Sequence, residues 1–459
     1  MAKRRAQAAA VVAALMVAAL SLPQPALATL GYRLDDPALA ARIDGAPVQA
    51  FSVDLLWRQA RVKEAKAARS TVLEEIVLNR LLVAAAHARF NEEQLFAGQR
   101  VAFARDVALD DQLVALLRSQ YGKELEQALA QLPGGSLEGL ISAQGKPDAA
   151  TLDAVFGKPD QLKLEYSLNA DQQARARNVV LLRYALPSGS GAVTLFDIYH
   201  RQNVQGRVAL FNRQADFLQQ QARLDLAGRF VLDWSTRRFG SAAVADLRRA
   251  LAERSEVLAL QQLHGIGDDI DTASPLLKQL AAQVGNAQIA AYYAQHREEF
   301  SRIEKVKARH IRLADEATAQ QVYAALSKGA EFAALARRYS IASDAVSGGD
   351  LGWIRHEGKP DWVAQLALAQ PEGPASRPFR TPAGPQDAAA WEIIQVQQKV
   401  QGYQAADSDS VRYAASNAVA RGSALAQWTA LRQQVLRAAR IEINRSQLDQ
   451  PLHLLNGAP

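Results

Sequence analysis

The residue types best suited to chemistry lie on two strand-like segments in the last third of the chain. His310 lies in EKVKARHIRL, which predicts a strand over Glu304–Leu313. Glu392 lies in a second apolar segment, Ala390–Val396, which predicts the last strand of the same region. A carboxylate beside an imidazole favours the charged imidazolium form. A Glu392–His310 contact is therefore chemically reasonable.

Several other chemistries are excluded by what the sequence lacks. There is no cysteine, so neither a thiol nucleophile nor a cysteine-based metal site is available. No histidine pair stands at helical spacing with an acid, as a zinc protease requires, and no G-x-S-x-G or phosphate-binding loop occurs. We predict no metal and no cofactor. The remaining histidines are scattered singly and are expected to have surface or packing roles: His87, His200, His264, His296, His356 and His453.

The elements between and after these residues form a recognisable order. AQQVYAALSKGAEFAALARRYS contains two helical patterns separated by a glycine. SGGDLGW, over Ser347–Trp353, predicts a tight glycine turn that enters another strand. The segments, their order and their spacing over Glu304–Val396 resemble the parvulin family of peptidyl-prolyl cis-trans isomerases.

The resemblance implies that the protein catalyses rotation about an X–Pro peptide bond. That reaction crosses a barrier of about 20 kcal/mol without breaking a bond, so it requires neither a nucleophile nor a metal. An apolar pocket for the proline ring and a few polar groups suffice. In the parvulin pattern, His310 is one polar group and Leu351 is the pocket leucine. Trp353, Trp362 and Phe379 are the further substrate-binding candidates. For His310 the alternative is a structural role between strands, and for the two tryptophans it is core packing.

Two positions depart from the family pattern. Where the family has a Cys or Asp facing the substrate amide, this chain has Ile341 or Ala342, so Asp344 substitutes only if the loop shifts. Where the family has a second histidine, this chain has Glu392. The catalytic candidates are therefore His310, Asp344 and Glu392. The glycines of SGGDLGW are expected to set the turn rather than take part in chemistry.

The first 28 residues predict a secretory signal. Lys3, Arg4 and Arg5 precede an apolar run over Ala8–Leu22, and small residues end the segment at Ala28. The run is shorter than the roughly 20 residues that span a bilayer, so we predict cleavage, export to the periplasm and no stable membrane span afterwards. Three of the 53 basic residues belong to this segment, which leaves 50 against 47 acidic residues. Such a balance gives no support for nucleic-acid binding.

A chain of 459 residues predicts more than one domain. The fold class expected is α+β: a mainly helical SurA-like chaperone module with one inserted parvulin-like domain, a small antiparallel sheet surrounded by helices. The expected parts are a signal peptide (1–28), a helical region (29–301), the parvulin-like domain (302–400) and a C-terminal segment (401–459) that packs on the helical region. Three further predictions concern local structure: a helix capped near Ser52, a loop-rich stretch over 133–161 and a long helical stretch over 207–263.

Two classes of function fit these features. The first is an exported prolyl isomerase-like folding factor that acts on unfolded or proline-containing polypeptides. The second is a holdase chaperone with impaired catalysis, in which the parvulin-like domain is kept for binding. A dedicated assembly partner of one secretion or outer-membrane system is a variant of the second.

Overall fold

The computed structural model describes residues 29–96, 104–159, 165–267, 274–356, 361–382 and 389–454. The predicted signal peptide lies outside these residues. The chain divides into two compact units, Met1–Lys278 with Ser423–Pro459, and Gln279–Gly422. The unit boundaries fall inside α12 (Pro275–Gln283) and α17 (Asp409–Ala438). The division of the chain into domains of separate function stays a prediction.

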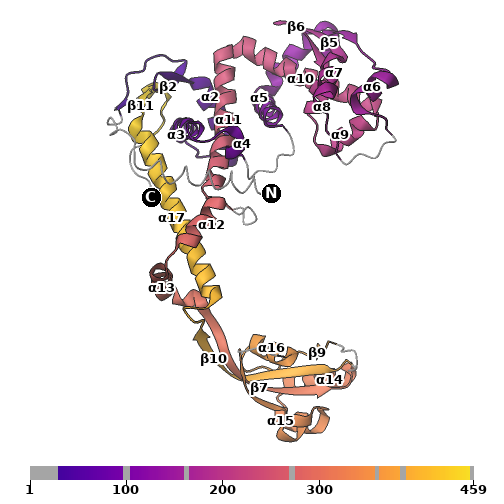
Figure 1. Cartoon of the computed structure of the whole chain (residues 1–459), viewed down its shortest axis with the longest axis vertical. Helices are drawn as coiled ribbons and strands as arrows, with labels where there is room; N and C mark the ends of the chain where they lie inside the picture. The colour runs from indigo at the N-terminus through magenta and orange to yellow at the C-terminus, as the bar shows by residue number, and fades with distance from the viewer. Residues whose placement is uncertain are drawn as a thin grey trace. The chain divides into compact units, whose positions relative to one another are not determined.

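The first unit contains helices in two groups and two sheets (Figure 1). Its helices are α2 (Ala50–Lys63), α3 (Arg69–His87), α4 (Glu92–Leu95), α5 (Arg105–Ala130), α6 (Ala149–Phe156), α7 (Ala170–Asn178), α8 (Leu195–His200), α9 (Val204–Phe211), α10 (Ala215–Phe239) and α11 (Ser241–Leu263). Its strands are β1 (Thr29–Gly31), β2 (Leu39–Ile43), β3 (Ala46–Gln49), β4 (Ile141–Gln144), β5 (Val180–Leu186), β6 (Gly189–Thr194) and β11 (Arg440–Ile443).

One sheet of this unit joins the two distant ends of the chain. Its strand order is β1-β11-β2-β3, and β11 pairs parallel with β1 and antiparallel with β2. The turn between β2 and β3 is the predicted Asp44–Gly45 turn, and both residues have the positive φ that such a turn requires, 49° and 85°. Ile441 and Ile443 of β11 are buried in the main core with side chains of α2, α3, α5 and α11.

A buried polar network ties this sheet to the helices. The Arg80 side chain of α3 is 3% exposed. Its Nη2 donates to Asp246 of α11 at 2.9 Å, its Nε lies 3.2 Å from Glu253, and its Nη1 donates to the Pro47 carbonyl at 2.9 Å. Burial raises the pKa of Glu253 despite the nearby positive charges of Arg80 and Arg249. Ser52 belongs to the network, since its hydroxyl donates to Asp246 at 2.6 Å.

Two local predictions are corrected by the structure and a third is confirmed. Ser52 is not a helix cap, because α2 begins at Ala50 and Ser52 lies inside it. The stretch 133–161 contains β4 and α6 within its described residues. The stretch 207–263 is helical as predicted, and it is divided into three helices because the backbone takes positive φ at Arg213 and Gly240. A residue with φ in this region cannot continue a right-handed helix.

The second group of helices in this unit, α6 to α9 with the first half of α10, has its own core. The sheet β4-β5-β6 is antiparallel, and β6 leads into α8. Thr194 caps α8 and exchanges hydrogen bonds with Asp197. Phe156, Leu181, Leu195, Ile198 and other apolar side chains of these elements are almost fully buried together.

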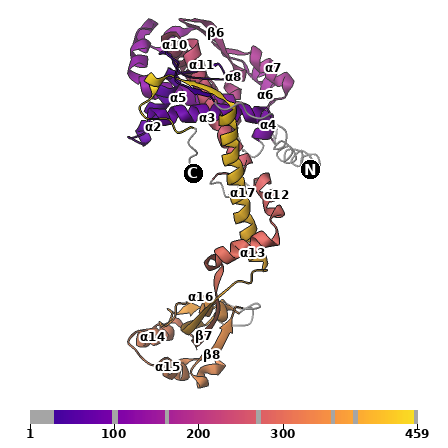
Figure 2. The same cartoon turned by 90° about the vertical axis from the view of Figure 1, so that its left-hand side faces the viewer.

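The second unit is built on one antiparallel sheet, in the order β8-β7-β10-β9. Its elements are α13 (Asn286–Gln295), β7 (Ser301–Leu313), α14 (Glu316–Ser327), α15 (Phe332–Tyr339), β8 (Asp350–Arg355), α16 (Trp362–Ala369), β9 (Phe379–Arg380) and β10 (Trp391–Tyr403). Helices α14 and α15 cover one face through Ile311 and Leu313, and α16 covers the other through Val306 and Ala308 (Figures 1 and 2). This is the α+β architecture expected for the region.

Replacing Arg80 should strongly destabilise the first unit. Arg80→Met leaves the buried Asp246 without its base and Glu253 with Arg249 alone, which costs roughly 3–5 kcal/mol of the free energy of unfolding. Arg254→Met is the matched control, because Arg254 pairs with Glu75 between the same two helices but both side chains are about 40% exposed. Its cost should stay below about 1 kcal/mol. Chemical denaturation measures both, and equal losses would contradict the role given to burial.

Candidate functional site

His310 lies between two carboxylates on the second unit's sheet. Its Nδ1 is 2.8 Å from Glu392 Oε2, and its Nε2 is 2.7 Å from Asp344 Oδ2. In the register of β7 and β10, His310 stands opposite Ile394 and Arg312 stands opposite Glu392. Glu392 is therefore a diagonal neighbour of His310 on the same face. The structure thus brings together the three residues predicted as catalytic candidates.

The two contacts define the protonation state of the ring. An ionised carboxylate has only acceptor atoms, so a ring nitrogen that bonds to it must carry a hydrogen. Both nitrogens of His310 face such acceptors, which makes the ring an imidazolium. Neither nitrogen is left to accept a proton. His310 in this arrangement holds charge and geometry and is not a general base.

Burial and charge act in opposite directions on the pKa of His310. Burial lowers the pKa, but the hydrogen bonds and charges of Glu392 and Asp344 outweigh it, so the pKa lies above the ordinary 6.5. Arg312 adds a second positive charge, with its Nε 2.9 Å from Glu392 Oε1. That contact is an ion pair by distance without hydrogen-bond geometry, since Oε1 has no hydrogen-bond partner. Two acids and two bases leave the cluster formally neutral.

The loop that carries Asp344 is positioned by backbone contacts to β7. Asp344 lies in a 3₁₀ turn, Ser343–Ser347, and its carbonyl accepts from the Gly349 amide at 3.0 Å. The Gly349 carbonyl in turn accepts from the His310 amide at 2.9 Å. A Cβ on Gly349 would lie 2.0 Å from the His310 carbonyl oxygen, and its φ is +72°. Only glycine fits here, and these contacts place the Asp344 loop beside His310.

The structure places the apolar candidates on different faces of the sheet. Leu351 packs against the α16 side of the sheet, the side of Val306 and Ala308. Phe379 stands opposite Glu392 in register, which puts both side chains on one face. Trp353 stands opposite Lys307 and is 44% exposed, with Lys305 Nζ 4.7 Å from its ring centre.

Trp353 therefore faces away from His310. Trp362 begins α16 and is half-buried, and among the described residues no hydrogen bond or ring contact joins it to the cluster.

Two residues of the site were not predicted from the sequence. Arg312 follows His310 by two residues on β7, so strand alternation alone could have placed it on the same face. Ser340 accepts from the Arg312 and Ala342 amides through its hydroxyl, at 3.1 and 3.3 Å, and so fixes the start of the loop. Within the described residues, no group of three or more acidic or histidine side chains is arranged to hold a metal ion.

The comparisons with known proteins concern the same stretch of chain. Residues 300–398 match the family model described as Rotamase, PPIC-type PPIASE domain. Foldase protein PrsA of Bacillus subtilis is 42% identical over 81 residues, which cover 17% of this chain and 28% of PrsA. Periplasmic chaperone PpiD of Haemophilus ducreyi is 37% identical over 99 residues, which cover 21% and 16% of the two chains.

A solved PpiC-type peptidyl-prolyl cis-trans isomerase domain is 31% identical and covers 22% of this chain and 97% of its own, at a TM-score of 0.18. The matched region is thus a PPIC-type rotamase domain. Residues 300–398 therefore form a domain of the parvulin type. The alignments span about a third or less of the lengths of the first curated relatives.

Adding one methyl group at Gly349 should displace the Asp344 loop. Gly349→Ala puts a Cβ against the His310 carbonyl and should cost several times the roughly 1–2 kcal/mol of a left-handed alanine. Gly352→Ala is the control, because Gly352 has a similar φ of +65° but open space around its Cβ position. Thermal unfolding and the histidine NMR signals should show a large effect only for the first variant. Equal effects would mean that backbone conformation, not the contact, matters.

The charge on His310 should make stability depend on pH. The folded protein holds the ring proton at pH values where the unfolded chain, with a pKa near 6.5, has released it. This stabilisation is complete below about pH 6.5 and is lost as pH rises through the higher folded-state pKa.

NMR titration of the ring protons should give a pKa above 6.5 for His310. In urea unfolding, His310→Gln should lose stability against wild type most at low pH, whereas His356→Gln, an exposed control, should not. A His310 pKa below 6.5 would contradict the imidazolium assignment.

Proposed function

We propose that the protein is an exported prolyl isomerase-like folding factor that binds unfolded or proline-containing polypeptides. The observation that supports it most is the His310 cluster within a PPIC-type domain, where Glu392 and Asp344 bond the two ring nitrogens. A curated relative matched over part of this domain is called a foldase.

The cluster offers electrostatics rather than proton transfer. A planar amide carries partial negative charge on its oxygen through resonance, and twisting the C–N bond removes that resonance. Asp344 Oδ1 is buried and has no hydrogen-bond partner among the described residues. A carboxylate oxygen near the substrate carbonyl opposes the planar form more than the twisted one, and Leu351 and Phe379 supply apolar contacts that exclude water.

Export to the periplasm belongs to the same proposal. It rests on the basic start, apolar run and small-residue end of the first 28 residues. A curated relative of the PPIC-type domain is named a periplasmic chaperone. None of the helices among the described residues combines the length and apolarity needed to cross a membrane.

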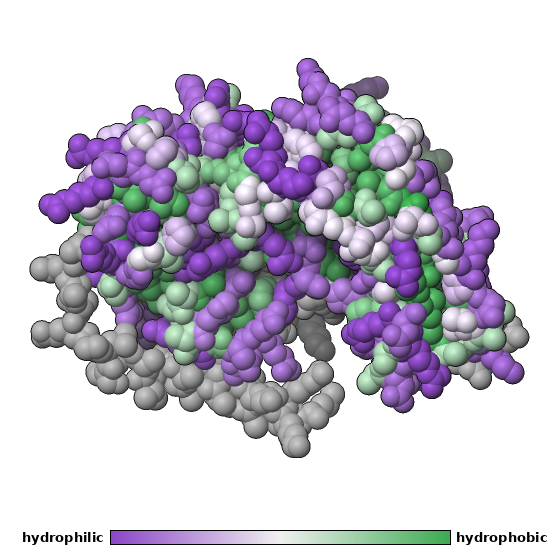
Figure 3. Space-filling view, turned by 90° about the horizontal axis from the view of Figure 1, so that it is seen from above, coloured by the Kyte–Doolittle hydropathy of each residue, from purple (hydrophilic) through white to green (hydrophobic). Residues whose placement is uncertain are grey.

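A holdase function is the second candidate, and a specific observation favours it. Both ring nitrogens of His310 are occupied by carboxylates, whereas Ile341 and Val346 beside Asp344 are exposed, at 59% and 85%. Exposed aliphatic side chains bind extended polypeptide without catalysis. On the one face that Figure 3 shows, hydrophobic residues gather in patches between hydrophilic ones.

Two assays on the full chain separate these functions. Exchange NMR on a short Ala-Pro peptide should show faster cis-trans exchange with added protein, and an unfolded client should aggregate less. His310→Ala and Asp344→Asn should slow the exchange at least tenfold, about 1.4 kcal/mol of barrier. His356→Gln should leave it unchanged.

Unchanged exchange together with suppressed aggregation would replace the isomerase by the holdase. If the protein neither speeds the exchange nor suppresses aggregation, both functions are excluded. Full isomerase activity in His310→Ala would remove that residue from the site.

A further inference from the structure

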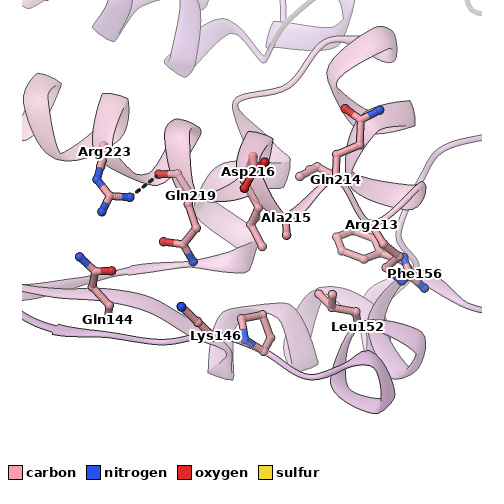
Figure 4. A pocket seen from close by; sticks show the side chains of 13 residues that line it. Gln144, Lys146, Leu152, Phe156, Arg213, Gln214, Ala215, Asp216, Gln219 and Arg223 are labelled. Carbon is pink, nitrogen blue, oxygen red and sulfur yellow. Dashed lines mark hydrogen bonds between the residues drawn. The ribbon is translucent and has the colours of Figure 1, made fainter.

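A cavity in the first unit lies far along the chain from the His310 cluster. It has a volume of about 410 Å³ and opens between the start of α10, helix α6 and the turn after β4 (Figure 4). This volume is within the range of sites for small ligands, roughly 300–1,000 Å³. The proposed prolyl isomerase chemistry makes no use of it.

One wall of the cavity is apolar and rigid. Leu152 and Phe156 of α6, Leu210 of α9 and Leu218 of α10 line it. Phe156 is almost fully buried, and its ring centre lies 4.9 Å from that of Phe211 with the rings tilted by 52°, so the wall is continuous with a packed core. A wall of this kind accepts an aliphatic or aromatic side chain by burial of apolar surface.

The facing side presents polar atoms that lack partners. Arg213 Nε, a donor, and Gln219 Oε1, an acceptor, are buried without hydrogen bonds among the described residues. Their directions are fixed, because Gln219 Nε2 donates to the Gly145 carbonyl at 3.1 Å and Arg213 Nη2 donates to Asp153 at 2.8 Å. Unsatisfied buried polar atoms cost free energy, which a ligand with both an acceptor and a donor would recover.

The end of α9 fixes where the Arg213 side chain lies. Arg213 has a φ of +59°, and the Gln214 amide donates to the Ala209 carbonyl at 3.2 Å, as at a left-handed helix end. Contacts to Asp153 and the Gly157 carbonyl then hold the side chain in place.

The charges on the lining favour an anion. Lys146, Arg213 and Arg223 line the cavity against one acid, Asp216. Arg213 and Arg223 have carboxylate partners, Asp153 and Glu138, whereas the Lys146 ammonium forms no ion pair with any described residue.

We propose that this cavity binds the carboxyl-terminal residue of a polypeptide that ends in an apolar side chain. The terminal carboxylate would bond to Lys146 and to Arg213 Nε, and the amide N–H of the last residue would donate to Gln219 Oε1. The side chain would lie on the Leu152–Phe156 wall. The proposal deepens the polypeptide binding proposed above and rests on it, but it concerns a separate site.

Fluorescence anisotropy on the full chain tests it with a labelled short peptide that ends in Leu, as free acid and as amide. The acid should bind roughly tenfold more tightly, since a charge-assisted hydrogen bond contributes about 1.5–3 kcal/mol. Lys146→Gln should remove most of the preference for the acid, leaving the part that Arg213 Nε supplies, and Gln219→Leu should weaken binding of both peptides. Lys123→Gln, an exposed lysine of α5, is the control, and unfolding curves check that each variant folds.

Equal binding of acid and amide, or an acid preference that Lys146→Gln leaves undiminished, would overturn the proposal. N-acetyl-leucine carries the same carboxylate, amide N–H and side chain, so it should displace the labelled acid, and failure to displace it would also overturn the proposal. His310→Ala should leave this binding unchanged. Loss of prolyl isomerase activity with intact acid preference therefore separates failure of the proposed function from failure of this inference.

Discussion

The first unit depends on a strand that the chain supplies almost at its end. β11 lies between β1 and β2, and its isoleucines complete the main core. Asn444 and Asp449 extend this closure, through bonds to the Leu39 carbonyl at 3.0 Å and to the Ser70 hydroxyl at 2.9 Å. Pairings of such high sequence separation form late in folding, since the loop they close is long. The second unit is one contiguous stretch, so its sheet forms without waiting for the chain's end.

Within that sheet, the long β7–β10 ladder decides which side chains meet. Glu392 is fully buried, and an isolated buried carboxylate is far too costly to persist. The register places His310 diagonally beside it and Arg312 opposite it, so charge compensation follows from backbone pairing alone. Asp344 then neutralises the remaining positive charge from a loop. The polar cluster is thus a condition for folding this sheet as well as a candidate site, and removal of any one charge leaves the others unbalanced.

Strand alternation predicts part of this site and fails at identifiable places. His310 and Glu392 follow from period-two patterning and are brought together as expected. The same rule puts Leu351 and Trp353 on one face, which is wrong. The register shifts between Ala308 and Arg309, so Leu351 is an extra residue in β8 and the faces reverse after it. A one-residue bulge has no local signal in the sequence. The position of Asp344 depends on the glycine conformations of the turn, which the sequence does not specify either.

The occupied imidazole restricts the chemistry that this domain supports. Hydrolysis, acyl transfer and proton abstraction need a group that takes up a proton, and His310 has no free nitrogen for it. Rotation about an amide bond needs no such group, because no bond breaks and the barrier comes from lost resonance. A neutral cluster with one unpartnered carboxylate oxygen, Asp344 Oδ1, is consistent with that electrostatic task. The replacement of a histidine pair by a histidine–glutamate pair therefore changes the charge presented to the substrate without removing the physical basis for isomerisation.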